Sequence, residues 1–512
     1  MTAADRMAGT RSTGRARDRL VVPLDGAVPP DRELFGGKAS SLLRMAALGV
    51  PVPPAFTLTT EACRRYQSNG RQLSARLWAQ VLDALDDLEA RTGRRFGGEP
   101  ALLVSVRSGA PVSMPGMMDT LLNVGLTRAA LAEFGEGRAA GQDTGWVAEL
   151  AEGIRKAFAD APFAVLTGRR TEEGRAEALA QLRWAIARIF DSWHNERAEV
   201  YRRANGISEQ LGTAVTVQAM VFGNRDDRSG TGVYLTRNPV TGANEPYGEW
   251  LPRAQGESLV SGERSALDLA ALRAAMPDVH SGLVSAGRRL EAIETHPVEI
   301  EFTVESGQLY FLQARRCTRT PQAAVRWAVE LVGEGLIGIP EALDRVDEDT
   351  VRKVIEGVGS AQAFGRLLAS GTGVVPGRCC GLVVDDADEA DRLAEDGQQV
   401  ILARPSTSPH DIHGFLAAAG VITERGGGTS HAAVVARQIG VPCVVGCGPG
   451  VVAATVGRVV TIDGTIGAVY DGALTETTEA APSTISPELS QLSRWRAAAT
   501  AQRISSTGRS DS

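Results

Sequence analysis

The stretch Gly426-Gly427-Gly428-Thr429-Ser430-His431-Ala432-Ala433-Val434-Val435, residues 426–435, decides how this chain is interpreted. It follows an apolar segment, 420–423, that is typical of a buried strand, and its alanines and valines continue as a helix. Three consecutive glycines allow the backbone conformations that a sharp strand-to-helix turn needs. The pattern therefore predicts a tight turn with His431 at the N-terminus of a helix.

A histidine in that position suits phosphoryl transfer. The unpaired N–H groups and the positive dipole end of a helix favour a phosphoryl group on the imidazole, by roughly 0.3–1 kcal/mol and up to ~2 kcal/mol when partly buried. With an ordinary pKa of about 6.5, the ring is largely neutral and nucleophilic at pH 7. Thr429 and Ser430 can hold the other ring nitrogen, cap the helix or bind the phosphate. The alternative is a helix-capping loop with an incidental histidine.

A hairpin over residues 297–315 carries two acidic residues on one strand. In Val298-Glu299-Ile300-Glu301-Phe302 the apolar residues alternate with acids, so Glu299 and Glu301 share one face. Two carboxylates at such a short distance repel each other, by ~4 kcal/mol at 4 Å with an effective dielectric constant near 20. A cation between them is therefore expected, and Mg²⁺ that bridges ATP phosphates is the natural one.

The second strand of this hairpin adds an amide and a cation. A three-residue loop at 305–307, with glycine in the left-handed position, pairs Glu299 opposite Gln313. This register places Gln313 and Arg315 on the same surface as the two glutamates. A solvated outer face of a sheet is the alternative.

Two further cations occupy positions suited to phosphates. Lys38 follows Gly36-Gly37 where a helix opens, so its charge can meet phosphates beside free N–H groups. Arg107 leaves the strand 104–107 on the face opposite the apolar residues. A solvated surface lysine and a surface salt bridge are the alternatives.

Composition limits the class of protein. The 512 residues are 43% hydrophobic and 22% charged, as in soluble globular proteins, and suggest about three domains. The formal net charge of −7 disfavours nucleic-acid and acidic-membrane binding. No apolar run approaches the ~20 residues of a membrane span. Six cysteines without metal-finger spacing favour a reducing cytoplasm.

The string around His431 resembles the phosphohistidine motif of the phosphoenolpyruvate-utilising dikinases. Further stretches, in family order between about residues 19 and 474, resemble pyruvate phosphate dikinase in particular. They are Gly36-Gly37-Lys38-Ala39, Val104–Ala110, Ser113–Thr120, Gly230–Pro239, Tyr247-Gly248-Glu249, Ala254-Gln255-Gly256-Glu257, Glu299–Phe302 and Leu312–Arg315.

The resemblance implies a multidomain α/β (α+β) fold in which an ATP-grasp nucleotide-binding domain precedes a swivelling β/β/α phosphohistidine domain. The expected boundaries are a disordered tail at 1–18, the ATP-grasp domain at 19–325 with a helical insertion at about 127–203, a helical linker at 326–368, the phosphohistidine domain at 369–474 and a low-complexity tail at 475–512. A swing of the second domain about joints near 369–374 is expected to bring the histidine to the nucleotide.

The resemblance also implies roles for individual residues. His431, Thr429, Ser430, Arg107 and Arg315 match catalytic positions; Lys38, Arg107, Glu257, Gln313 and Arg315 match ATP and phosphate positions; Glu299 and Glu301 match the Mg²⁺ ligands. Three positions depart from the family pattern: Glu299 replaces an aspartate, Ser258 replaces a second acid after Glu257, and Gly428 replaces a methionine.

The family's phosphoenolpyruvate- and pyruvate-binding barrel has no counterpart before Ser512. We therefore expect the chain to form AMP and phosphorylated His431 from ATP, with phosphate or water accepting the γ-phosphoryl group. A separate barrel protein would then supply the pyruvate half-reaction. The alternatives are a dikinase with another small-molecule or protein acceptor, and a non-catalytic nucleotide sensor or phosphocarrier.

Overall fold

The computed structural model describes residues 19–112, 114, 117–136, 145–166, 171–256, 266–357, 366–473 and 486–507. It divides into two compact units, one of Met1–Asp226 with Thr303–Ala314 and one of Asp227–Phe302 with Arg315–Ser512. Helices and several sheets confirm the predicted mixed α/β class. Within the described ranges, no helix combines the length and apolar character that crossing a membrane requires. The domain boundaries expected from the sequence remain a prediction.

The first unit contains a five-stranded antiparallel sheet. Its order is β1-β2-β7-β5-β6. The strands are β1 (Val21–Pro23), β2 (Ala55–Leu58), β5 (Val104–Gly109), β6 (Thr120–Val124) and β7 (Ala214–Ala219), and the short strands β3 (Arg95–Phe96) and β4 (Ala101–Leu102) pair separately. Strand β5 lies inside the sheet and buries every residue but Arg107, which is half-buried. The sheet thus fixes the backbone from which Arg107 projects.

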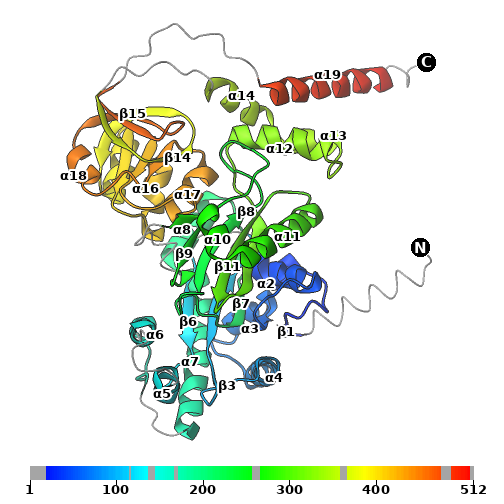
Figure 1. Cartoon of the computed structure of the whole chain (residues 1–512), viewed down its shortest axis with the longest axis vertical. Helices are drawn as coiled ribbons and strands as arrows, with labels where there is room; N and C mark the ends of the chain where they lie inside the picture. The colour runs from blue at the N-terminus through cyan, green and yellow to red at the C-terminus, as the bar shows by residue number, and fades with distance from the viewer. Residues whose placement is uncertain are drawn as a thin grey trace. The chain divides into compact units, whose positions relative to one another are not determined.

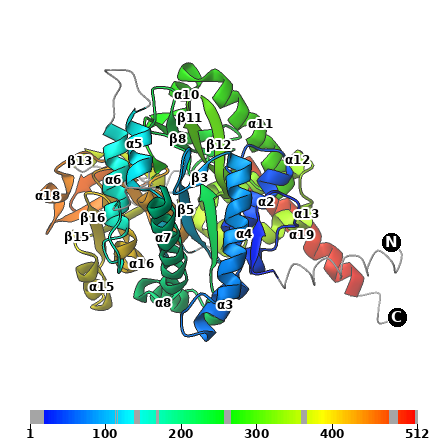
Figure 2. The same cartoon turned by 90° about the horizontal axis from the view of Figure 1, so that it is seen from below.

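Helices cover this sheet. They are α2 (Arg32–Ala47), α3 (Thr60–Ser68), α4 (Ala75–Thr92), α5 (Arg128–Glu136), α6 (Gly145–Ala157), α7 (Thr171–Asp191) and α8 (Glu196–Ala204). Figure 2 shows the long helices α4 and α7 flanking strands of the sheet, and α5 to α8 fill the chain between β6 and β7. Ser74 caps the N-terminus of α4 and Gly93, with φ of 65°, ends it.

A second sheet has the order β10-β9-β8-β11-β12. Its strands are β8 (Gly230–Leu235), β9 (Tyr247–Pro252), β10 (Leu267–Asp268), β11 (Val298–Glu305) and β12 (Gln308–Arg316). Helices α10 (Leu269–Ala275) and α11 (Pro277–Glu294) lie between β10 and β11 in the chain. The boundary between the two units passes through the hairpin of β11 and β12.

The turn of this hairpin differs from the prediction. Strand β11 ends at Glu305 and β12 begins at Gln308, so the loop has two residues and not three. Ser306 and Gly307 both adopt left-handed φ, of 50° and 84°. Such a turn matches the twist of the two strands. The predicted loop length is therefore wrong, and the pairing of Glu299 with Gln313 that rested on it stays a prediction.

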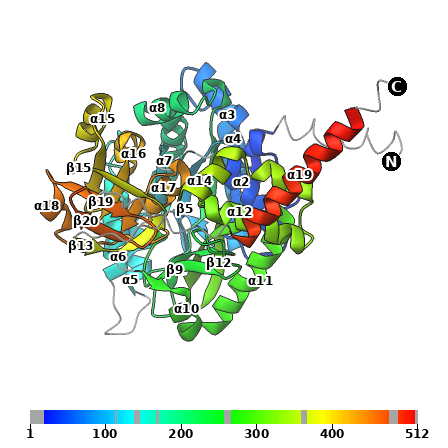
Figure 3. The same cartoon turned by 90° about the horizontal axis from the view of Figure 1, so that it is seen from above.

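Helices α12 (Pro321–Gly333), α13 (Ile339–Arg345) and α14 (Glu348–Gly357) follow β12. Thr320 caps the N-terminus of α12, since its hydroxyl accepts from the N–H of Ala323 at 3.1 Å. A last helix, α19 (Pro487–Thr507), lies beside α12 and α13 (Figure 3). Its Leu489 and Leu492 are buried in the same apolar cluster as residues of α12 and α13.

The remainder of the second unit is an eight-stranded sheet of order β13-β20-β19-β15-β16-β17-β18-β14. Strands β15 to β18 run parallel, and the others are antiparallel to their neighbours. Its elements are β13 (Leu367–Ser370), β14 (Thr372–Val375), β15 (Arg378–Val384), α15 (Ala387–Glu395), β16 (Val400–Arg404), α16 (Ile412–Ala417), β17 (Gly420–Thr423), α17 (His431–Ile439), β18 (Cys443–Val445), α18 (Val451–Thr455), β19 (Val459–Asp463) and β20 (Ala468–Asp471). Figure 1 shows these strands with α15 to α18 beside them.

The predicted joint at 369–374 is wrong. These residues belong to β13 and β14, which pair with β20 and β18. The N–H of Gly371 donates to the Gly467 carbonyl at 2.8 Å, and a Cβ at Gly371 would lie 2.4 Å from the Val445 carbonyl oxygen. Since both strands are held in the sheet, this segment cannot bend without breaking it.

Candidate functional site

His431 is the first residue of α17, as the glycine-rich turn predicts. Strand β17 ends at Thr423, and the chain then reverses through Gly426, whose φ is 107°. Ser430 occupies the N-cap position, but its side chain makes no capping bond. The N-terminus of a nine-residue helix thus lies beside the imidazole, where the dipole and the free N–H groups favour an anion.

The two ring nitrogens of His431 have different surroundings. Nδ1 lies 3.4 Å from the hydroxyl oxygen of Thr407, whereas Nε2 is buried and has no hydrogen-bond partner among the described residues. Burial lowers the pKa of His431, and the carboxylate of Asp411 opposes that shift. The ring is therefore neutral at pH 7, and in the tautomer whose Nδ1–H donates to Thr407, Nε2 keeps a lone pair that can bond to phosphorus.

The loop before His431 is clamped by strand β9. One Glu249 oxygen accepts from the N–H of Gly428 at 2.8 Å, and its other oxygen accepts from the hydroxyl of Thr429. Glycine leaves room for this approach: a Cβ at Gly427 would lie 2.2 Å from the Glu249 carboxylate and one at Gly428 2.0 Å from the Tyr247 hydroxyl, so these side chains or the loop would have to shift. The Ser430 hydroxyl is buried without a partner in the described part of the chain.

Buried Glu299 forms an ion pair with the half-buried Arg315. Both Nε and Nη2 of Arg315 donate to Oε1 of Glu299, at 3.1 and 2.5 Å. Glu299 raises the pKa of Arg315, and Glu301 adds to the effect. Oε2 of Glu299 is buried and has no hydrogen-bond partner among the described residues. One carboxylate oxygen thus anchors the arginine while the other remains available to a cation.

This acidic face fits Mg²⁺. The described residues contain no group of three or more histidine, cysteine, aspartate or glutamate side chains placed to hold a metal. Mg²⁺ does not need one, because proteins bind it through one or two carboxylates together with substrate phosphates and water. Glu301 lies two residues from Glu299 on β11, so both project from the same face. Together with the free Oε2, they fit a Mg²⁺ ion that arrives with a nucleotide.

Lys38, Arg107 and Gln313 lie in the first unit. Helix α2 kinks at Gly36, where φ is 73°, and a Cβ there would lie 1.6 Å from the carbonyl oxygen of Gly109. The N–H of Gly37 donates to the Ala110 carbonyl at 2.9 Å, which ties the start of the regular helix to the end of β5. This packing brings Lys38 next to the strand that carries Arg107.

The strand that carries Gln313 is bonded to the same helix through the neighbouring residue, Ala314. The hydroxyl of Ser41, one turn after Lys38, donates to the Ala314 carbonyl at 2.6 Å and accepts from its N–H at 2.8 Å. Oε1 of Gln313 is buried and unpartnered within the described ranges. Glu257 lies outside the described residues. The structure therefore groups the predicted residues into three sets: Lys38, Arg107 and Gln313; Glu299, Glu301 and Arg315; and Thr429, Ser430 and His431.

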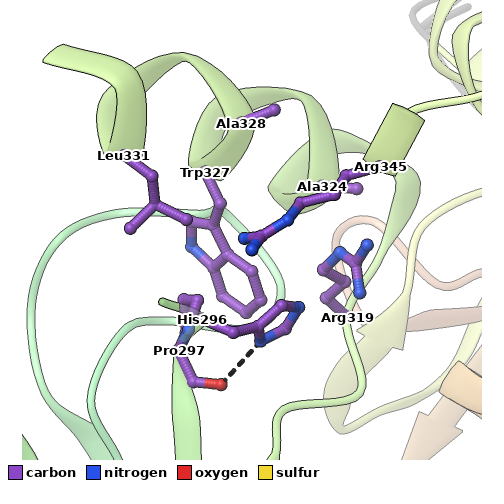
Figure 4. A pocket seen from close by; sticks show the side chains of 8 residues that line it. All are labelled: His296, Pro297, Arg319, Ala324, Trp327, Ala328, Leu331 and Arg345. Atoms are coloured by element: carbon purple, nitrogen blue, oxygen red, sulfur yellow. Dashed lines mark hydrogen bonds between the residues drawn. The ribbon is translucent and has the colours of Figure 1, made fainter. Parts of the chain in front are cut away.

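A small pocket of the second unit contains none of these residues (Figure 4). It is lined by His296, Pro297, Arg319, Ala324, Trp327, Ala328, Leu331 and Arg345. Nδ1 of His296 donates to the Pro297 carbonyl at 2.9 Å, and the ring meets that of Trp327 edge-on. Burial lowers the pKa of His296 to about 3. The pocket is thus a packed environment for a neutral histidine, separate from the three sets.

Three contacts of the histidine loop were not predicted from the sequence. Glu249 belongs to a stretch that carried the family resemblance, but its role was not assigned. Thr407 and Arg437 were not identified at all, although Arg437 donates to the Gly428 carbonyl at 2.7 Å. A single acid in the otherwise uncharged strand β9 was the available signal for Glu249, whereas no local pattern indicates its partner 180 residues away.

Comparison with known proteins identifies both parts of the chain. The family model described as pyruvate phosphate dikinase, AMP/ATP-binding domain, matches residues 69–269. The model described as PEP-utilising enzyme, mobile domain, matches residues 397–467. The second match includes His431, and the first includes Arg107 and Glu249.

Whole-chain relatives agree. The chain is 39% identical to pyruvate, phosphate dikinase of Clostridium symbiosum, over 88% of the chain and 58% of the relative. It is 40% identical to pyruvate, phosphate dikinase 2 of Zea mays, over 81% and 51%, and 39% identical to the Rhizobium meliloti enzyme, over 86% and 56%. It spans about half the length of these relatives. The chain therefore contains a nucleotide-binding domain and a mobile domain that are similar to those of the pyruvate phosphate dikinases.

Proposed function

We propose that this chain is a dikinase-type phosphotransferase that phosphorylates His431 from ATP. One observation carries the proposal: Nε2 of His431 is buried, unpartnered among the described residues and placed at the N-terminus of α17. A lone pair in that environment suits a phosphoryl acceptor better than a structural histidine, whose ring nitrogens are normally bonded.

The nucleotide is proposed to bind through the residues that the family resemblance assigns to ATP and phosphate. Lys38 and Arg107 neutralise phosphate charge, Gln313 offers its amide, and Arg315 is held by Glu299 in a fixed orientation. Glu257 is proposed to contribute as well, on the family resemblance alone. Such groups position a phosphoryl group and stabilise its transferring charge, which is where the catalytic effect in these reactions originates.

Glu299 and Glu301 are proposed to hold Mg²⁺. When bound, the ion would offset the negative charge of the phosphate oxygens. Arg315 holds Glu299 in place by donating two hydrogen bonds to its Oε1. The unpartnered Oε2 supports this role, since a buried carboxylate oxygen without a donor needs a cation.

The transfer is proposed to proceed at the β-phosphorus of ATP. The Nε2 lone pair forms the N–P bond while the P–O bond to the α-phosphate breaks, and AMP leaves with that oxygen. The diphosphoryl group then loses its terminal phosphoryl to an oxygen of orthophosphate, which releases pyrophosphate, or to water, which releases phosphate. His431 retains one phosphoryl group. Glu249 holds Gly428 and Thr429 in place during these steps through its hydrogen bonds to the loop.

The final acceptor is proposed to be pyruvate, on a separate phosphoenolpyruvate- and pyruvate-binding barrel protein. The names of the relatives support pyruvate and phosphate as the two acceptors. Another small molecule or a protein side chain is the second candidate acceptor, and it leaves the chemistry at His431 unchanged.

Product analysis tests the proposal. The protein is incubated with Mg²⁺ and ATP labelled in the α-phosphate, and the nucleotides are separated. We expect AMP in an amount equal to the amount of phosphorylated chain. When orthophosphate is added and the phosphoryl group on His431 is removed, we expect further AMP together with pyrophosphate. Formation of ADP would contradict the proposal, and unchanged ATP that binds without reaction would favour a nucleotide sensor.

A further inference from the structure

Arg437 is a buried cation that the proposed reaction has not used. It lies on α17, six residues after His431, and only 5% of its surface is exposed. Side chains of a helix tilt toward its N-terminus, so the long arginine side chain reaches back along α17. Its Nη1 donates to the carbonyl of Gly428 at 2.7 Å. Arg437 thus holds the carbonyl side of the residue whose N–H is held by Glu249.

The groups that attract Arg437 most strongly lie on strands β9 and β11, which do not belong to the eight-stranded sheet beside α17. Burial lowers the pKa of Arg437, and Glu299 on β11 is the group that opposes this most, followed by Tyr247 on β9. Arg315 repels it. Glu299 thus attracts the Arg437 guanidinium electrostatically, while its hydrogen-bonded partner is Arg315.

The hydrogen bonding of Arg437 is incomplete in the described part of the chain. Its Nε is buried and has no partner there, and no carboxylate lies within ion-pair distance of it. A buried guanidinium without a bonded carboxylate is costly, and a protein retains one where its charge serves a purpose. Its main neighbour of opposite charge is the Glu299 carboxylate, whose Oε2 is also unpartnered.

We propose that Arg437 is a positioning residue for phosphoryl transfer, which joins the His431 loop to the Glu299 site. It fixes the loop through Gly428 and places a positive charge beside Glu299, so that the loop docks in register with the bound nucleotide. The inference rests on the proposed function, because it concerns the same transfer. Arg437 itself contacts neither His431 nor the reacting phosphorus in this assignment.

Two phosphoryl donors separate this role from a structural one. ATP phosphorylates His431 only when the loop is docked at the nucleotide site. Phosphoramidate is a small donor whose P–N bond breaks as Nε2 forms its own bond to phosphorus, with ammonia leaving, so it needs no docking. We compare Arg437→Gln and Arg437→Lys with wild type, and with Arg378→Gln as a matched control, since Arg378 pairs with Asp463 in the same sheet.

We expect Arg437→Gln to lower the rate constant of ATP-dependent labelling about 100-fold, with the KM for ATP unchanged, because misplaced reacting groups lose that much. Labelling by phosphoramidate stays near the wild-type rate. Arg437→Lys keeps the charge without the planar fork and recovers about tenfold of the loss. Arg378→Gln leaves both reactions unchanged.

Two results would overturn the inference: wild-type labelling of Arg437→Gln by ATP, or an equal loss of labelling with both donors. The second would assign Arg437 to the shape of the loop alone. Failure of the proposed function looks different, because wild-type protein would then accept phosphoryl from phosphoramidate and not from ATP.

Discussion

Two histidines of the second unit, His431 and His296, lie in regions that hold an imidazole in different ways. Burial lowers the pKa of each, so both rings are neutral at pH 7. His296 donates from Nδ1 to a backbone carbonyl and packs against Trp327. His431 leaves Nε2 unpartnered among the described residues, behind a loop clamped by Glu249. Burial alone makes a histidine neutral; the glycine turn and helix N-terminus make one of them an acceptor.

The largest effect is expected from the charged surroundings of the His431 loop. Glu299→Gln leaves Arg315 without its carboxylate and removes a proposed Mg²⁺ ligand, so ATP-dependent labelling of His431 should fall about 1000-fold. The rate of labelling measures the effect. The parallel change at the other histidine, Arg345→Gln, should leave labelling unchanged. Equal losses in the two variants would remove the distinction between the regions.

The clamp on the loop is expected to contribute less. Glu249→Ala removes the acceptor for Gly428 N–H and for the Thr429 hydroxyl, and we expect ATP-dependent labelling to fall about 100-fold. Phosphoramidate labelling, which needs no docking, should persist. Glu245→Ala, an exposed acid nearby on the chain, is the matched control. Undiminished labelling of Glu249→Ala by ATP would mean that the clamp has no part in transfer.

Loop shape gives a smaller effect. In Gly428→Ala the new Cβ meets the Tyr247 hydroxyl, so the loop must shift, and we expect about a tenfold loss of ATP-dependent labelling. Gly333→Ala is the control, because nothing lies within 4 Å of a Cβ there. Crystal structures of the two variants would show whether the loop moves. If Gly428→Ala labels normally, tight approach to β9 is not required.

The smallest expected effect is the contribution of His296 to the pH dependence of the free energy of unfolding. Its folded pKa of about 3 lies below the ordinary 6.5, so the unfolded chain takes up the proton first as the pH falls. The stabilisation is complete above pH 6.5 and is lost toward pH 3, at about 1.4 kcal/mol per pH unit. Urea unfolding at several pH values should show a shallower slope in His296→Phe than in wild type. Identical slopes would contradict a buried neutral His296.

The sequence predicted the parts of the site that depend on local pattern. Three glycines before an alternation of helical period place His431 at a helix start, and period-two alternation places Glu299 and Glu301 on one face. The hairpin loop was predicted one residue too long, because Ser306 adopts a left-handed conformation that is uncommon outside glycine. The predicted pairing of Gln313 with Glu299 rested on that loop length.

The remaining contacts join residues far apart in the sequence. Glu249 meets Gly428 across 179 positions, and Glu299 on β11 acts electrostatically on Arg437 of α17. Periodicity describes one element at a time, so it indicates which face a side chain occupies and not which distant residue it meets. The same limit explains the wrong joint at 369–374, where glycines that look like a linker pack closely within a sheet.

One labelling experiment tests the central claim most directly. Wild type, His431→Ala and His296→Phe are incubated with Mg²⁺ and ATP carrying a radioactive β-phosphate. The account predicts label that is lost in acid and stable in base on wild type and His296→Phe, and none on His431→Ala. Label on His431→Ala at the wild-type level would contradict it.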